Sequence, residues 1–102
     1  MVILPTYNEA DNLPRLVPSI LEQDPRIDVL VVDDDSPDGT GALADELSQG
    51  SDRVNVIHRS GKHGLGGAYI EGFRWGLERN YDLLFEMDAD FSHRPDALPL
   101  FI

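Results

Sequence analysis

Two aspartates, Asp88 and Asp90, follow an apolar run in the stretch FEMDADFSHRPD (85–96). At this spacing an extended turn can direct both carboxylates towards one hard cation such as Mg²⁺ or Mn²⁺. Such an ion keeps open coordination positions and can bridge a diphosphate. His93 is close enough in sequence to be a third ligand, although a histidine after such a turn is more often a surface residue. The stretch alone leaves a metal site and a polar loop both open.

A second acidic cluster, Asp33 to Asp35, ends the apolar run in VLVVDDDSPDGT (29–40). Carboxylates at the end of a strand could accept hydrogen bonds from a nucleoside. SPDGT is turn sequence, in which Asp38 or a neighbour is expected to cap the next helix. Receiver domains of two-component signalling also carry an acidic pair after an apolar strand. In those domains the pair follows the first strand and an aspartate follows the third, whereas VNVIHRSGK (54–62) contains no aspartate, so this alternative is disfavoured.

The glycine-rich stretch GKHGLGG (61–67) does not match a nucleotide phosphate loop. Lys62 is followed by His63 instead of Ser or Thr, and it precedes most of the glycines. A dinucleotide-binding fingerprint would follow the first strand instead. We interpret the stretch as a turn that borders the ligand cleft and opens a closely packed helix.

Strand and helix signals alternate along the chain, and these elements must position the clusters. Short apolar runs predict strands at 1–4, 27–32, 54–57 and 81–87. Periodic apolar residues predict helices from Asn8 or Glu9 to Leu21, over 42–47, and after the glycine-rich turn. Pro14 falls in the first turns of a helix, where proline is tolerated, and Pro95 suits the start of another.

This order predicts an α/β fold with a mainly parallel sheet and helices on both faces. Ligands of such sheets collect at the carboxyl ends of the strands. Three polar clusters lie at such ends, namely PTYNE (5–9), DDDSPDGT (33–40) and DADFSH (88–93). Their shared location favours one site built from all three.

The third helix carries two rows of residues. One row at i, i+4 spacing lies along one side: Leu65, Tyr69, Phe73 and Leu77. The other contains only small residues: Ala68, Gly72 and Gly76. A glycine inside a helix costs about 1 kcal/mol relative to alanine, so the small row predicts close approach to another element. Glu86 lies in the fourth strand on the same face as Asp88, and we expect it to be structural or to support the metal ligands, and not to be a ligand itself.

Composition restricts the partners. The chain of 102 residues is enough for one small domain. It has 19 acidic and 8 basic residues, and its net charge of −11 argues against a nucleic-acid groove, which needs a basic surface. This field would also repel a phosphate ligand unless a divalent cation accompanied it.

The absence of cysteine excludes disulfides and thiolate metal sites, and no apolar run approaches the roughly 18 residues that span a bilayer. The final segment PDALPLFI (95–102) ends without a cap, so we expect the N-terminal part of a longer protein.

Four blocks together resemble the family 2 glycosyltransferases of the GT-A (Rossmann-like) fold: LPTYNEADNLP (4–14), VLVVDDDSPDGTG (29–41), GKHGLGGAYIEGF (61–73) and MDADFSHRPDALP (87–99). Within that family they are most similar to the polyprenol-phosphate (dolichol-phosphate) mannose synthases. The resemblance implies that residues 1–102 are the incomplete, nucleotide-sugar-binding part of a catalytic domain. It also implies inverting transfer of mannose from GDP-mannose to a polyprenol phosphate, with Mg²⁺ or Mn²⁺, on the cytoplasmic side of a membrane.

The resemblance also implies site residues. The nucleotide pocket would be lined by Pro5, Tyr7 and Glu9, and the base and ribose would be held by Val32 and Asp34. The sugar diphosphate and its metal would meet Asp88, Ala89 and Asp90, with Asp88 and Asp90 as ligands and Asp90 the chief catalytic group. Many relatives have Gln where this chain has Ser92, whose shorter hydroxyl would reach the metal through a water.

The chemistry agrees with this resemblance. A departing nucleoside diphosphate needs a cation and not an acid. A phosphate monoester acceptor is largely dianionic at pH 7, because its second pKa is about 6, and needs no strong base. Another nucleotide sugar, such as UDP-glucose, remains an alternative donor. A nucleotidyltransferase would show a basic glycine-rich loop after the first strand, which PTYNEADN (5–12) lacks. Because the acceptor half would lie beyond Ile102, we expect these 102 residues alone to be inactive.

Overall fold

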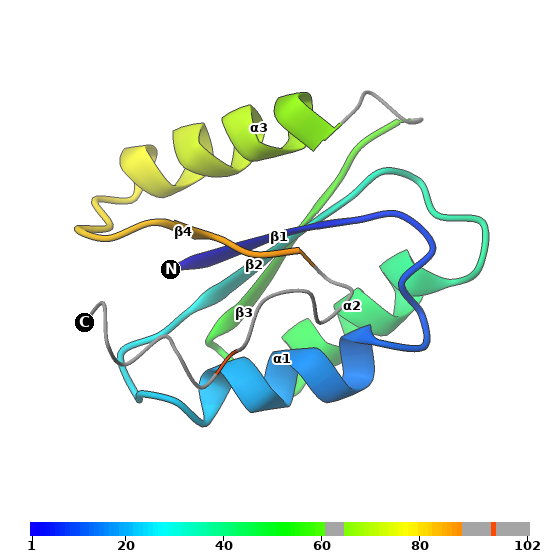
Figure 1. The fold of residues 1–102 in the computed structure, drawn as a ribbon, viewed down its shortest axis with the longest axis horizontal. Coiled ribbons are helices and arrows are strands. Elements are labelled where there is room, and N and C mark those ends of the chain that lie inside the picture. The colour runs from blue at the N-terminus through cyan, green and yellow to red at the C-terminus, as the bar shows by residue number, and fades with distance from the viewer. Residues whose placement is uncertain (61–64, 89–94, 96–102) are drawn as a thin grey trace.

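A computed structural model describes residues 1–60, 65–88 and 95 of the chain. Figure 1 shows strands and helices alternating in this order: β1 (Val2–Thr6), α1 (Leu13–Leu21), β2 (Val29–Asp33), α2 (Thr40–Gln49), β3 (Val54–His58), α3 (Leu65–Glu78) and β4 (Phe85–Glu86). The strands form one sheet in the order β3-β2-β1-β4, and every neighbouring pair is parallel. The predicted parallel α/β fold is confirmed.

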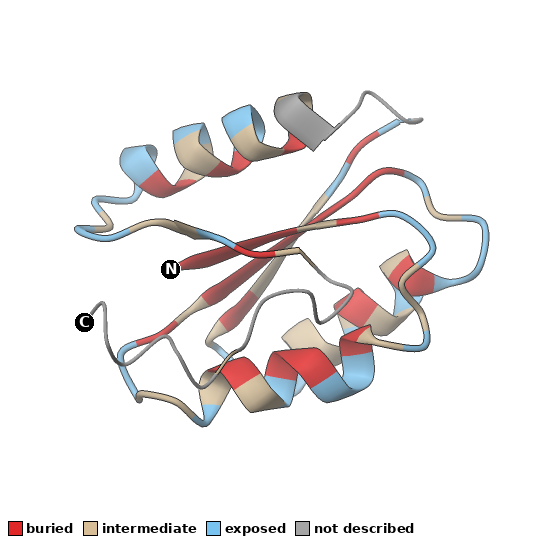
Figure 2. Ribbon diagram, viewed as in Figure 1, coloured by how far each residue is buried: buried red, intermediate tan, exposed pale blue. Residues whose placement is uncertain are grey.

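Helices cover both faces of the sheet, as predicted. α1 and α2 lie on one face and α3 on the other (Figure 1). Successive strand residues point to opposite faces, so β1 directs Val2 and Leu4 towards α1 while Met1 and Ile3 lie beneath α3. All five residues of β2 are buried (Figure 2). An apolar run without alternation is what a strand covered on both faces requires.

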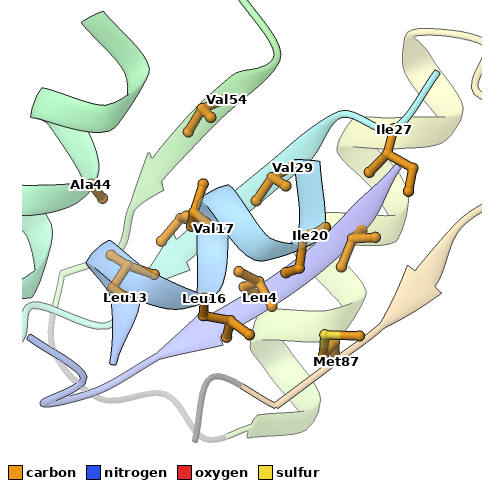
Figure 3. Close-up of a cluster of buried hydrophobic side chains, with 12 residues drawn as sticks. Leu4, Leu13, Leu16, Val17, Ile20, Ile27, Val29, Ala44, Val54 and Met87 are labelled. Atoms are coloured by element: carbon orange, nitrogen blue, oxygen red, sulfur yellow. The ribbon is translucent and has the colours of Figure 1, made fainter. Parts of the chain in front are cut away.

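The larger core lies between the sheet and α1 (Figure 3). The helix buries one stripe, made of Leu13, Leu16, Val17 and Ile20. Burying each of these side chains contributes about 1.5–3 kcal/mol. A helix of nine residues would not be stable alone, so this packing is what holds it. Pro14 occupies the first turn as predicted, and a second proline, Pro18, lies inside the helix.

α1 begins at Leu13, and the prediction of a start at Asn8 or Glu9 was wrong. Asn8 has a left-handed backbone (φ +57°), which a helix cannot contain. The N–H groups of residues 8–10 donate to side chains that follow β2. These tertiary hydrogen bonds favour a loop where periodicity alone favours a helix. The bounds of β1 to β3 and of α2 differ from the predictions by one or two residues at their ends.

The fourth strand is shorter than the predicted 81–87, because only Phe85 and Glu86 pair with β1. Among the described residues this strand pairs with β1 alone, and Tyr81 donates a hydrogen bond to Asp28. The side chain of Glu86 is exposed, so the structural role expected for it has no support from packing.

The row of small residues on α3 marks a close approach, as predicted. A Cβ atom on Gly72 would lie 2.5 Å from Cγ2 of Ile3, and one on Gly76 would lie 2.7 Å from Cδ2 of Leu84. The row at i, i+4 spacing does not stay on the face that packs against the sheet, because each step of four residues turns about 40° around the helix. Leu77, at the end of that row, is therefore 66% exposed. No helix in the described ranges is long and apolar enough to cross a membrane.

The strand order identifies the edge where a ligand should lie. The chain runs from β1 through β2 to β3 in one direction and then returns with α3 to place β4 on the other side of β1. The direction therefore reverses between β1 and β4, and ligands of open α/β sheets bind at such a switch point.

Candidate functional site

Two loops are tied together at the carboxyl edge of the sheet. The N–H groups of residues 8, 9 and 10 donate to Ser36 Oγ (3.0 Å), Thr40 Oγ1 (2.9 Å) and Asp38 Oδ2 (3.1 Å). The loop that follows β1 is thus bound to the segment that follows β2. This arrangement gives PTYNE a defined position beside the acidic cluster, as the sequence predicted.

Asp38 organises the start of α2. Its Oδ1 accepts the N–H of Thr40 at 3.0 Å and also the Thr40 hydroxyl. Gly39 occupies the N-cap position with a left-handed backbone (φ +90°). The expected capping role of Asp38 is confirmed in that it binds the first helical N–H. The hydrogen bond from the Thr40 hydroxyl lowers the pKa of Asp38, so this carboxylate stays ionised.

The adjacent carboxylates Asp33 and Asp34 point to opposite faces of the sheet, because strand side chains alternate. Asp33 faces α1 and α2 and accepts hydrogen bonds from the Thr6 hydroxyl (2.7 Å), the Ser36 N–H (3.1 Å) and the Ser36 hydroxyl (2.6 Å). It is 2% exposed and fully engaged. Its chemistry is therefore structural, since it joins the ends of β1 and β2.

Asp34 faces α3 and lies beside Arg59, whose Nε is 3.2 Å from Asp34 Oδ1. The N–H of Asp34 donates to the carbonyl of Thr6 at 3.0 Å, which extends the pairing of β1 and β2 by one residue. Asp34 is 6% exposed and Arg59 is 9% exposed. Sequence reasoning missed Arg59. A signal existed, because it is one of 8 basic residues and directly follows the third strand.

The other predicted nucleotide residues are placed as follows. Pro5 is half-buried at the end of β1, and Tyr7 is 39% exposed beyond it. Glu9 is half-buried, and its Oε2 accepts a hydrogen bond from Asn12 Nδ2 at 3.2 Å. Val32 is completely buried beneath α3, so only its backbone could reach a nucleotide.

Asp88 lies at the end of β4, where Tyr69 of α3 donates a hydrogen bond to Asp88 Oδ1 at 3.0 Å. The sequence placed Tyr69 in the i, i+4 row of the helix but did not predict this hydrogen bond. A buried tyrosine hydroxyl usually has a hydrogen-bond partner. The predicted residues Ala89, Asp90 and Ser92, with His93, lie outside the described residues. Within the described ranges, no group of three His, Cys, Asp or Glu residues could hold a metal. The carboxylate of Asp88 fits the oxygen ligands that Mg²⁺ and Mn²⁺ take.

A cavity of about 220 Å³ lies at the opposite, amino edge of the sheet, lined by Met1, Arg26, Ile27, Tyr81, Asp82, Leu83 and Phe85. None of the predicted site residues that the structure describes lines it. Strand topology and the polar clusters instead point to the carboxyl edge, where the side chains needed for nucleotide chemistry gather.

Two known proteins with similar sequences carry names that refer to mannose and a polyprenol. The chain is 59% identical over 99 residues to a polyprenol monophosphomannose synthase of Mycolicibacterium smegmatis, covering 96% of this chain and 37% of that protein. It is 58% identical over 99 residues to an undecaprenyl-phosphate mannosyltransferase of Micrococcus luteus, covering 97% and 41%. The chain thus spans about two fifths of the length of these relatives.

Solved structures agree on the fold. A mannosyltransferase of Pyrobaculum calidifontis, PcManGT, in complex with GDP-Man and Mn²⁺, superimposes with a TM-score of 0.71 at 26% identity, covering 95% of this chain and 30% of that one. TarS of S. aureus superimposes with a TM-score of 0.72 at 24% identity, covering 98% and 18%, and shows the fold alone.

The parallel sheet, its helical layers and these neighbours identify the GT-A fold. The model of glycosyl transferase family 2 matches residues 1–102. The chain belongs to glycosyl transferase family 2, as its four sequence blocks predicted.

Proposed function

We propose that the whole protein transfers mannose from GDP-mannose to a polyprenol phosphate, with inversion at the anomeric carbon and with Mg²⁺ or Mn²⁺ at the site. The observation that carries this proposal is the placement of Asp34 and Asp88 on the α3 side of the carboxyl edge, from β2 and β4 respectively. These strands flank β1 at the switch point. The names of the two relatives support the acceptor, and the bound GDP-Man and Mn²⁺ of PcManGT support the donor and metal.

The nucleoside end of the donor would lie over β1 and β2. Asp34 would accept hydrogen bonds from the base or ribose, beside the backbone of Val32. The pocket would be completed by three residues at and after the end of β1: Pro5, Tyr7 and Glu9. The hydrogen bonds from residues 8–10 to the segment after β2 would keep this pocket formed before the nucleotide arrives.

The diphosphate end would lie at β4. Asp88 and Asp90 would hold the cation, beside Ala89 and Ser92, with Asp90 as the chief ligand. When bound, the cation would neutralise negative charge on the leaving diphosphate. The acceptor phosphate would be largely dianionic at neutral pH and would attack C1 in line without a general base. Tyr69 would orient the Asp88 carboxylate through their hydrogen bond.

Transfer assays on the whole protein test this proposal. Labelled GDP-mannose and a polyprenol phosphate should give polyprenol-phosphate mannose, whereas UDP-glucose should be a poor donor. Asp88→Asn keeps a hydrogen-bond acceptor for Tyr69 but removes the charge, and we expect kcat/KM to fall about 100-fold or more. Asp52→Asn removes the same charge from an exposed turn before β3 and should leave kcat/KM unchanged. Full activity of Asp88→Asn, or transfer from UDP-glucose alone, would contradict the proposal.

A further inference from the structure

Arg59 and Asp34 are neighbours across the sheet and are both withdrawn from solvent. β2 and β3 end with Asp33 opposite His58. Asp34 and Arg59, which directly follow these two strands, are therefore also neighbours. The Arg59 N–H donates to the carbonyl of Asp33 at 2.8 Å and continues the ladder. The side chain of Arg59 is 6% exposed and that of Asp34 is 8% exposed. Arginine and aspartate are rarely buried this far unless they are paired.

The pair is close but poorly hydrogen-bonded. Asp34 Oδ1 and Arg59 Nε lie 3.2 Å apart, yet neither atom, nor Arg59 Nη1, has a hydrogen-bond partner among the described residues. Removing two charges from water carries a large desolvation penalty, which an ion pair offsets only when its remaining hydrogen bonds are satisfied. This pair is therefore a weak source of stability. Stability does not explain why the two charges are buried at this edge.

The packing of α3 accommodates the guanidinium specifically. A Cβ atom on Gly67, in the first turn of α3, would lie 2.8 Å from Arg59 Nη2. Any larger residue there would displace the buried arginine. Glu71, one turn further along the helix, places Oε1 3.6 Å from Arg59 Nε. The guanidinium is thus enclosed by α3 on one side and by the end of β2 on the other.

We infer that Arg59 is a positioning residue for the nucleotide, which fixes the Asp34 carboxylate in a buried orientation between β2 and the first turn of α3. The inference rests on the proposed function in that Asp34 binds the nucleoside. Arg59 acts through Asp34, and Gly67 provides the space in which it does so. A neutral side chain at position 59 would leave a buried carboxylate without its neighbouring cation, and that carboxylate would turn away from its present position.

A double-mutant cycle measured by calorimetry with GDP and Mn²⁺ on the whole protein tests this inference. Asp34→Asn and Arg59→Met should each weaken GDP binding about tenfold or more. The double variant should bind GDP at most about threefold less tightly than whichever single variant binds it less tightly. The reason is that the effects of residues that act through one another are not additive. A loss of GDP affinity in the double variant equal to the product of the two single losses would show that Arg59 acts independently of Asp34. Unchanged GDP binding by Arg59→Met would overturn the inference directly.

Two further measurements separate positioning from loss of fold. Binding of pyrophosphate with Mn²⁺, which lacks the nucleoside, should be unchanged in Arg59→Met, and a parallel loss of both ligands would show a merely structural role. Gly67→Ala keeps the arginine but displaces it. Introduced into the wild type, it should weaken GDP binding several-fold, whereas introduced into the Asp34→Asn variant it should have no further effect. The control Gly50→Ala, whose Cβ would meet only ordinary contacts at 3.7 Å, should leave GDP binding unchanged.

The outcomes also distinguish this inference from the proposed function. If Asp34→Asn binds GDP as tightly as the wild type, the nucleoside role of Asp34 is wrong and the inference falls with it. If Asp34→Asn weakens GDP binding but neither Arg59→Met nor Gly67→Ala does, the inference alone is wrong.

Discussion

At the scale of single residues, neighbouring side chains of the same type have different tasks. Asp33 is surrounded by donors from Thr6 and Ser36 and holds two strands together. Asp34, one residue later, faces the opposite side and meets Arg59. Two tyrosines differ in the same way, since Tyr69 meets Asp88 at the candidate site while Tyr81 meets Asp28 at the opposite edge of the sheet.

The Tyr81–Asp28 contact gives a prediction about pH. Burial, together with the hydrogen bond to Asp28, raises the pKa of Tyr81 from 10.0 to about 12. The neutral phenol is favoured in the folded state, so its stabilising contribution is complete below pH 10 and is lost as the pH rises through about 12. The difference in phenolate absorbance between the wild type and Tyr81→Phe, followed as the pH is raised, should therefore show a midpoint near pH 12.

The variant Asp28→Ala separates the two causes of this shift. It removes the hydrogen bond and the nearby negative charge, so the midpoint should move towards 10 while burial keeps it above 10. A wild-type midpoint at 10 would contradict the structure at this contact.

At the scale of elements, α1 forms in spite of its local sequence. It has two prolines, no acidic residue in its first turn and no side-chain hydrogen bond at its N-cap. Four fully or almost fully buried side chains, from Leu13 to Ile20, hold it against the sheet. Tertiary packing therefore outweighs weak helix propensity in this element.

The two prolines provide a matched test within one helix. Pro18 is exposed and lies inside the helix, where it cannot donate a hydrogen bond to the carbonyl of residue 14. Pro18→Ala should restore that bond and raise the free energy of unfolding by about 2 kcal/mol, allowing for the greater entropy of the unfolded chain. Pro14→Ala, in the first turn, should change it by less than about 1 kcal/mol. Denaturant unfolding measures both, and equal effects of the two substitutions would refute this account.

At the scale of the whole molecule, the net charge of −11 opposes the ligand that we propose. A nucleoside diphosphate would approach an edge that carries Asp34, Asp35 and Asp88. The surrounding field repels the diphosphate but has little effect on an uncharged nucleoside. A bound cation would reverse the local charge at the β4 end of this edge.

Removal of the metal should therefore affect two related ligands differently. With EDTA in excess, we expect the affinity for GDP to fall about tenfold or more, and the affinity for guanosine to change less than about twofold. Added NaCl should partly restore metal-free GDP binding, because salt screens exposed charges with a Debye length of about 10 Å at 0.1 M. Calorimetry gives both affinities. Equal GDP binding with and without EDTA would exclude a metal bridge.

Much of this architecture was predictable because the relevant signals are local. Periods of 2 and 3.6 residues indicate strands and helices, and their alternation favours a parallel sheet. The same order brings PTYNE, the acidic cluster and Asp88 to one edge of the sheet. The row from Ala68 to Gly76 predicted close packing of α3, since glycine inside a helix requires a reason. The family was also recognisable from its four sequence blocks.

Other features depend on contacts between residues far apart in the chain. α1 begins late because the N–H groups of residues 8–10 bind side chains about 30 positions away. β4 is short because, in the part of the chain that the structure describes, only Phe85 and Glu86 pair with β1. The sequence by itself determined the class of fold and the edge where the chemistry gathers, since periodicity and strand order are properties of the chain. Only the tertiary structure decided that Asp33 is structural, that Asp34 meets Arg59 and that Tyr69 meets Asp88, because the faces of separate elements become neighbours only after they pack.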